Sequence, residues 1–191
     1  MNRHLPLVLI VALLIVFRIV GSAMPESFPN FQPLAALFFC GAVMLSGWRS
    51  WAIPLAAWLV TYPAPALIEG NGSYLSPMVV FSTGCAFAVV YLLGKSISGA
   101  KFGTLILGSV GAALAFHLIT NGLAWIGSPM YAKNLEGFWQ SVWAGPLGST
   151  IPSWVFLRNM TVANVIFTAI LLSARFSLPA LQKDTQHAPA R

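Results

Sequence analysis

Long apolar blocks separated by short polar breaks occupy most of the 191-residue chain. A membrane-crossing helix needs about 20 mostly apolar residues. Blocks close to that length lie at 5–21, 34–50, 51–69, 78–95, 102–126 and 159–177. The pattern predicts an all-α fold, a polytopic bundle of six transmembrane helices that forms one domain over residues 1–178. The polar tail 179–191 is expected to be a disordered cytoplasmic segment.

Prolines mark where two of these blocks begin and end. The second block is short, and Asn30-Phe31-Gln32-Pro33 extends it at its start. Pro54 lies near the start of the third block, where proline costs a helix little. Pro63 and Pro65 are expected to end or kink the third helix near its far side.

The composition agrees with a chain embedded in lipid. Hydrophobic residues make up 58% of the chain and charged residues 7%, whereas soluble domains carry about 25% charged residues. The formal net charge is +6, but the cations stand singly between apolar blocks. This distribution argues against nucleic acid as a partner and is typical of topology signals.

The cations also predict an orientation. With the N-terminus inside and the spans alternating, seven cations fall on the inner side and two on the outer side. The outer pair is Lys133 and Arg158, and the inner set is Arg3, Arg49, Lys95, Lys101, Arg175, Lys183 and Arg191. This bias predicts a multi-pass protein of the bacterial cytoplasmic (inner) membrane, with both termini in the cytoplasm.

The first block has a second interpretation. Arg3, the apolar stretch and Gly21-Ser22-Ala23 resemble a secretory signal with a small-residue cleavage site. Arg18 interrupts the stretch late, which is unusual for a signal and favours a retained helix. A mature chain that starts at Met24 would have one span fewer.

Polar side chains within the spans are candidates for function because they are costly in lipid. Arg18 either snorkels to the outer interface or faces inward and binds an anionic group. His117 and Asn121 are four residues apart and share one helix face, which Trp125 extends. They form either an interhelical hydrogen-bonded pair or one wall of a polar pocket open to the outside. The convergence of polar groups at one depth favours the pocket.

The stretch 127–158 is the longest segment predicted outside the spans. Residues 135–142 are expected to form a short amphipathic helix at the surface. Long loops with structure of their own are often lids or binding loops. Trp139, Gln140 and Arg158 are the candidate binding residues here, although a single Trp is by default a marker of the membrane interface.

Signatures of catalysis are weak. Ser149 and His117 are the best candidates for an intramembrane Ser–His pair, but no orienting acid is visible. Cys40 and Cys85 lie singly in apolar blocks, and no spacing of His, Cys or carboxylates is typical of a metal site. We therefore expect no enzyme activity, no metal and no cofactor.

Small residues recur at four-residue spacing in the fourth and fifth spans. The pairs are Gly84/Ala88, Gly108/Ala112 and Gly111/Ala115. Such pairs let helix backbones approach closely. Packing within the bundle is the favoured interpretation, and a docking face for another membrane subunit is the alternative.

Several short motifs lie between residues 15 and 173. They are Asn30-Phe31-Gln32-Pro33, Thr120-Asn121, Leu135-Glu136-Gly137-Phe138-Trp139-Gln140, Ala144-Gly145-Pro146 and Phe156-Leu157-Arg158-Asn159. In combination they resemble a family of uncharacterised bacterial membrane proteins classed with transport proteins. That family in turn resembles the substrate-binding S subunits of energy-coupling-factor (ECF) vitamin transporters.

The resemblance implies a six-helix, ECF S-component-like fold that binds a vitamin-like molecule from the outer side, beneath loops. It also implies a membrane coupling subunit with paired ATPases as a partner. The sequence departs from the expected pattern at Asn164, where many relatives are expected to carry an acidic residue. The Ala-x-x-x-Ala pattern expected in the first helix of S subunits is missing from 5–21.

These observations predict a membrane transport protein that binds a small organic solute, such as a vitamin or cofactor precursor, from the outer side for uptake. The expected partners are the solute, the lipid bilayer and the coupling subunit with its ATPases. The expected pocket residues are Arg18, Asn30, His117, Asn121, Trp139, Gln140 and Arg158. An intramembrane enzyme acting on lipid or peptide and a non-catalytic accessory subunit are the alternatives.

Overall fold

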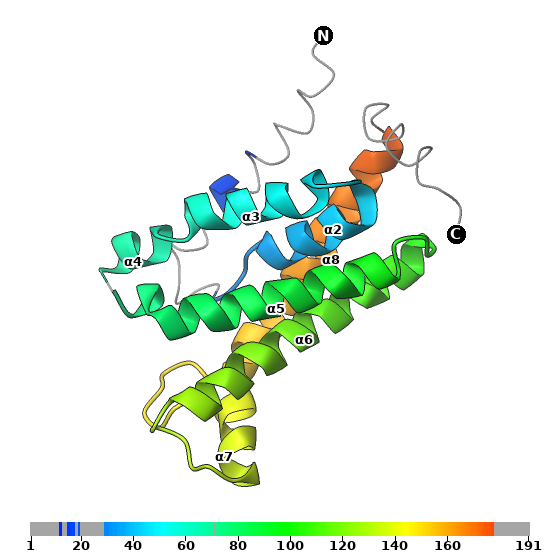
Figure 1. The fold of residues 1–191 in the computed structure, drawn as a ribbon. Coiled ribbons are helices and arrows are strands. Elements are labelled where there is room, and N and C mark those ends of the chain that lie inside the picture. The colour runs from blue at the N-terminus through cyan, green and yellow to red at the C-terminus, as the bar shows by residue number, and fades with distance from the viewer. Residues whose placement is uncertain (1–11, 13–14, 18, 20–28, 71, 178–191) are drawn as a thin grey trace.

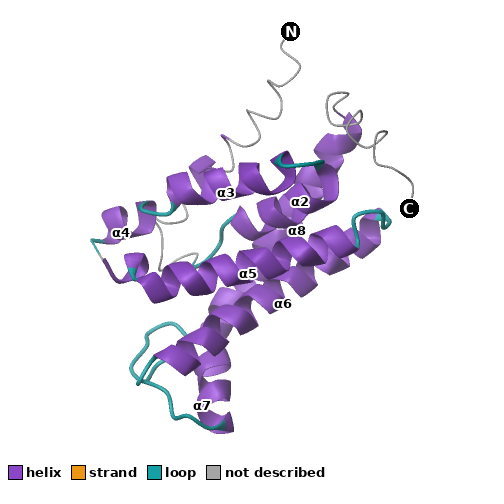
Figure 2. Cartoon of the chain, in the orientation of Figure 1, coloured by secondary structure: helices purple, strands orange, loops and turns teal. Residues whose placement is uncertain are grey.

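The structure is a computed structural model that describes residues 12, 15–17, 19, 29–70 and 72–177. Arg18 and the predicted tail 179–191 lie outside the described residues, as does most of the predicted first span. Within the described part every regular element is a helix, which confirms the all-α class (Figures 1 and 2).

The helices follow one another through short connections. In chain order they are α2 (Leu34–Met44), α3 (Arg49–Thr61), α4 (Ala64–Glu69), the 3₁₀ turn η1 (Gly72–Leu75), α5 (Pro77–Ser96), α6 (Phe102–Gly127), α7 (Leu135–Trp139), the π-helical turn η2 (Gln140–Ala144) and α8 (Ser153–Ser177). Four stretches of the described chain are long and apolar enough to cross a membrane: Arg49–Ile68, Pro77–Ser96, Phe102–Gly127 and Ser153–Ala174. Candidate spans are thus confirmed, and the total of six stays a prediction.

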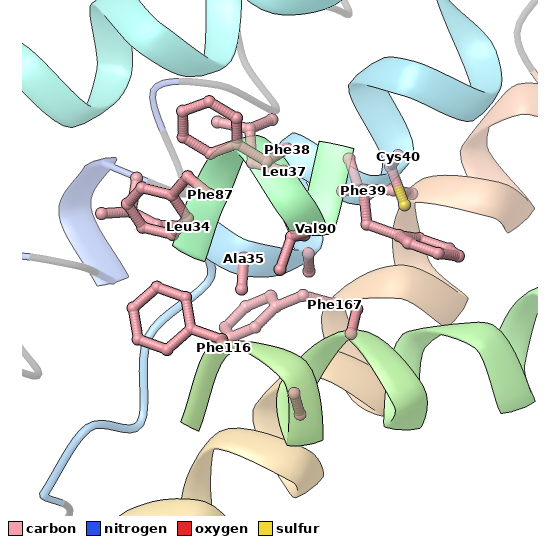
Figure 3. Close-up of a cluster of buried hydrophobic side chains, with 14 of the residues drawn as sticks. Leu34, Ala35, Leu37, Phe38, Phe39, Cys40, Phe87, Val90, Phe116 and Phe167 are labelled. Carbon is pink, nitrogen blue, oxygen red and sulfur yellow. The ribbon is translucent and has the colours of Figure 1, made fainter. Parts of the chain in front are cut away.

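Helix α2 is the centre of the described fold. All of its 11 residues are buried because α3, α5 and α8 pack around it. Phe38 stacks on Phe87 of α5 with 4.4 Å between ring centroids, and aromatic rings from several helices meet at α2 (Figure 3). At about 1.5 Å per residue, a helix of this length covers roughly half of a hydrocarbon core about 30 Å thick.

The predicted extent of the second span, 34–50, is therefore wrong. The helix ends at Met44, and the chain then turns through Gly47, whose φ of 60° lies in the left-handed region that glycine adopts without strain. Helix α3 begins two residues later at Arg49. The turn carries Ser46, Gly47 and Arg49, so the predicted span ran past polar residues that mark the break.

Proline divides the next candidate span, as predicted. Helix α3 begins at Arg49, so Pro54 lies inside it rather than near its start as predicted. The helix ends at Thr61, and Pro63 is the N-cap residue of the short helix α4. Proline has no backbone N–H to donate, so the ladder of helix hydrogen bonds is interrupted there. The predicted block 51–69 is thus two helices in line.

Two other predicted spans agree closely with the structure, and a third does not. The blocks 78–95 and 102–126 correspond to α5 and α6 within one residue at each end. The last span, predicted at 159–177, begins six residues earlier at Ser153, directly after Pro152. Proline is common at the start of a helix. Because α8 begins at Ser153, the Phe156–Asn159 motif lies in its first turns.

Glycines let the helices approach each other closely. A Cβ atom at Gly94 of α5 would lie 2.6 Å from the carbonyl oxygen of Phe39 in α2, and one at Gly108 of α6 would lie 3.1 Å from the Phe39 ring. Gly84 of α5 faces Trp58. These contacts support packing within the bundle for Gly84 and Gly108, whereas Gly111 is exposed and has no neighbour within 4 Å.

Large apolar side chains stay exposed on the outer faces of the long helices. Examples are Leu59 and Val60 on α3, Phe81 and Leu92 on α5, and Leu107 on α6. Soluble monomers rarely expose so much contiguous apolar surface. These faces therefore match lipid as their solvent.

Candidate functional site

The first polar cluster joins α6 to the turn η2. The ring of His117 lies 2.8 Å, by its Nε2 atom, from the carbonyl oxygen of Val142. A carbonyl only accepts, so Nε2 carries the proton and Nδ1 accepts from the Asn121 amide at 3.2 Å. The same amide donates to the His117 carbonyl at 2.9 Å. Both ring nitrogens of His117 thus have hydrogen-bond partners within the protein. The bond from His117 to Val142 joins η2 to α6, and we call it the latch.

The segment between α6 and α7 is held by side chains that bind main-chain oxygens. Trp125 donates its indole N–H to the Ala132 carbonyl at 2.8 Å. Lys133 donates to the carbonyls of Trp125 and Ser128 at the end of α6, where a cation is favoured by the helix dipole. Tyr131 is buried in this turn, and burial raises the pKa of its phenol, which stays neutral.

Helix α7 begins with a side-chain cap and a close approach. Asn134 is its N-cap residue and accepts from the backbone N–H of Gly137 at 2.8 Å. A Cβ atom at Gly137 would lie 1.9 Å from the Ala132 carbonyl oxygen, so only glycine fits there. Gln140, at the start of η2, donates to the Gly145 carbonyl at 3.3 Å. Trp139 lies on the opposite side of this segment and is exposed.

The second polar cluster joins the turn before α2 to the start of α8. Asn159 donates to the Pro29 carbonyl at 3.0 Å, and Asn30 donates to the sulfur of Met160 at 3.5 Å. Asn30 adopts a φ of 59°, a left-handed conformation that asparagine tolerates. The Gln32 amide donates to Asn30. These bonds dock residues 29–32 on α8 across 130 positions of sequence.

Two groups at this cluster retain binding capacity. The buried Oε1 atom of Gln32 has no hydrogen-bond partner within the described chain. Arg158 donates from Nε to Asn159 at 3.1 Å, and its guanidinium carbon lies 5.4 Å from the centroid of the Trp154 ring. Arg158 is otherwise exposed. The cluster thus offers an acceptor and a cation in two neighbouring hydrogen-bonded chains, which the backbone joins at Pro29–Asn30 and at Asn159–Met160.

The comparisons with known proteins reach the level of the family. A family described as "Family of unknown function (DUF6580)" matches residues 1–186. The chain belongs to this family. No curated protein and no solved structure matches the chain. The family description names no activity.

The predicted pocket residues divide between the two clusters of this DUF6580 chain. His117, Asn121 and Gln140 belong to the latch of η2 on α6, and Asn30 and Arg158 belong to the network between the α2 turn and α8. Trp139 belongs to neither, since it lies exposed on α7. Arg18 is outside the described residues.

Ser149 and His117, the candidate catalytic pair, are not hydrogen-bonded to each other in the described structure. Ser149 donates to the Ile151 carbonyl in its own loop at 2.8 Å, and its side chain is exposed. His117 is occupied by Val142 and Asn121. Activation of a serine requires the base within hydrogen-bond reach, and the bonds of both side chains lead elsewhere.

Sequence reasoning missed Gln32, Asn159 and the Val142 carbonyl as members of these clusters. Gln32 and Asn159 stand in the motifs that carry the family resemblance, so their polar character next to apolar helices was a usable signal. A main-chain carbonyl gives none, because every residue has one.

A third polar cluster lies inside the bundle. Asn164 of α8 donates to the Ser109 carbonyl of α6 at 3.2 Å, and both residues are fully buried. The Oδ1 atom of Asn164 has no hydrogen-bond partner within the described chain. Thr168, one turn further along α8, lies next to the Cys40 thiol of α2. Asn164 thus ties α8 to α6 through a neutral amide.

Proposed function

We propose that this DUF6580 chain is a membrane transport protein that binds a small organic solute at the end of the bundle where α2 and α8 begin. The observation that carries the proposal is that the unpartnered Gln32 acceptor and the exposed Arg158 cation lie in two neighbouring hydrogen-bonded chains, which meet where the α2 turn docks on α8. A buried acceptor without a partner costs about 1–3 kcal/mol. A ligand that donates a hydrogen bond to it recovers that energy.

The two groups define the chemistry of the solute. Arg158 offers a planar guanidinium, which suits a carboxylate or a phosphate. Gln32 Oε1 takes an amide, amine or hydroxyl donor. A small organic acid with a polar N–H or O–H group, such as a vitamin or a cofactor precursor, fits both requirements.

The direction of binding and the coupling partner rest on the sequence. The distribution of cations favours the start of α2 and α8 as the outer side, so the solute is taken from outside for uptake. A role like that of an ECF S subunit, with a membrane coupling subunit and paired ATPases, is supported by the motif resemblance. The same end carries the segment 128–152, which the latch at His117 holds against α6.

Thermal unfolding of the purified full chain in detergent tests the proposal. The probes are vitamins, cofactor precursors, small carboxylic acids and phosphate esters, each added singly. A ligand at 100 times its Kd stabilises the folded state by about 2.7 kcal/mol. We expect the increase in unfolding temperature to be lost in Arg158→Ala and Gln32→Leu.

Lys101→Ala is the matched control. Lys101 is an exposed cation at the opposite end of the bundle, before α6, and its removal should leave the ligand effect intact. The proposal fails if no probe stabilises the wild-type chain. It also fails if the stabilisation is the same in the wild-type chain and in both site variants.

A further inference from the structure

The segment that follows α6 carries an apolar stripe on its outer surface. Leu135, Trp139 and Trp143 are 71%, 56% and 60% exposed. They are spaced by four residues along α7 and η2, so they share one face of this helical segment. Leu147, just beyond it, is 88% exposed. We call these four residues the outer stripe.

The opposite face of the same segment is small or polar. Gly137 and Ser141 are buried, and the Val142 carbonyl binds His117. Ser141 satisfies its hydroxyl on the Phe138 carbonyl at 2.8 Å. A short helix on the surface of a soluble protein has the reverse arrangement, with its apolar side inward. The outer stripe is therefore arranged for an apolar environment.

The position of the latch gives the depth of the segment. His117 lies ten residues before Gly127, where α6 ends, so the Val142 carbonyl lies about 15 Å back along the helix from that end. Helix α6 has 26 residues and a length of about 39 Å, against a hydrocarbon core of about 30 Å. Even if all of the excess length, about 9 Å, projects at this end, the Val142 carbonyl lies about 6 Å inside the edge of the hydrocarbon.

We propose that the outer stripe packs against phospholipid at the boundary between head groups and acyl chains. The stripe adjoins the long helices, because η2 packs against both α6 and α8. Tryptophan favours this boundary, since its ring is apolar and its N–H is polar. Trp143 also stacks on Trp154 of α8 with 6.3 Å between ring centroids, which extends the aromatic surface onto a spanning helix. The inference does not depend on solute binding.

Site-directed fluorescence in nanodiscs of phosphatidylcholine and phosphatidylglycerol tests the lipid contact. Cys40→Ala and Cys85→Ala remove the native thiols, and Leu135→Cys or Leu147→Cys carries an environment-sensitive label. Glu136→Cys is the matched control, because Glu136 is exposed on the same helix but lies next to the stripe rather than in it. Quenching is measured with a lipid that carries a nitroxide near its head group and with aqueous iodide.

We expect labels at Leu135 and Leu147 to emit at shorter wavelength than the label at Glu136. Nitroxide lipid should quench them more strongly than the control label, and iodide more weakly. Equal quenching by iodide at all three positions would overturn the proposal.

A second measurement keeps both native cysteines. Brominated lipid should quench less of the total tryptophan emission in Trp139→Phe/Trp143→Phe than in the wild-type chain, and the half-buried Trp125→Phe should change this fraction less. An unchanged quenched fraction in the double variant would also contradict lipid contact.

Discussion

Replacing His117 by alanine should release η2 from α6 without unfolding the bundle. The substitution removes the Nε2 bond to the Val142 carbonyl at 2.8 Å and the Nδ1 bond from Asn121 at 3.2 Å. A hydrogen bond contributes about 1 kcal/mol net, and a buried carbonyl left unpaired costs about 1–3 kcal/mol. We therefore expect the local closing of η2 to weaken by about 2–4 kcal/mol, which is about 30- to 700-fold in the opening equilibrium.

Hydrogen exchange followed by mass spectrometry measures this opening in detergent or nanodiscs. The reporter is the amide of Gly145, which donates to the Gln140 carbonyl at 2.7 Å. Exchange at 138–146 should accelerate in His117→Ala, while the amides of α2 and α5 keep their wild-type rates. His117→Gln is the matched control, because its side-chain amide can still donate to Val142. Equal exchange in His117→Ala and His117→Gln would refute the latch.

Three further predictions concern packing. Gly94→Ala should lower the unfolding temperature in detergent, because its Cβ would lie 2.6 Å from a main-chain oxygen of α2. The control is Gly111→Ala, which should leave the unfolding temperature unchanged or raise it slightly, because a Cβ there has no neighbour within 4 Å. Gly137→Ala should accelerate hydrogen exchange in α7, since its Cβ would lie 1.9 Å from a carbonyl oxygen, and wild-type rates would contradict this close approach. In a Cys85→Ala chain, a thiol-reactive dye should label the buried Cys40 only as the chain unfolds; labelling at low temperature would show that the core is open.

The sequence predicted helices well where polar residues or prolines bound an apolar run. Helices α5 and α6 begin and end within one residue of their predicted limits, and Pro63 separates α3 from α4. The prediction was wrong at the end of α2. There Ser46, Gly47 and Arg49 mark the turn, but single polar residues between apolar ones do not by themselves show that a helix ends.

The candidate site was predictable only where its residues are close in sequence. The four-residue spacing of His117 and Asn121 placed them together, and the structure joins them by a hydrogen bond. The partner of His117 is a main-chain carbonyl of another segment. The contact between Asn159 and Pro29 spans 130 positions. Neither contact produces a periodic pattern in the sequence, so neither could be predicted from the sequence.

The sequence by itself indicated that the helices of this protein are surrounded by lipid. Runs of apolar residues without charges are stable in lipid only as helices, because every main-chain N–H and C=O must be satisfied within the segment. Charge content and proline positions then set most helix limits.

Only the tertiary structure decided which helix is central and which polar groups meet. In lipid a helix is apolar on the face toward its neighbours and on the face toward the membrane, so the sequence does not distinguish the two. The burial of α2 on all sides, the latch of His117 on Val142 and the docking of residues 29–32 on α8 follow from close packing between distant segments. That packing depends on the shapes of side chains in three dimensions.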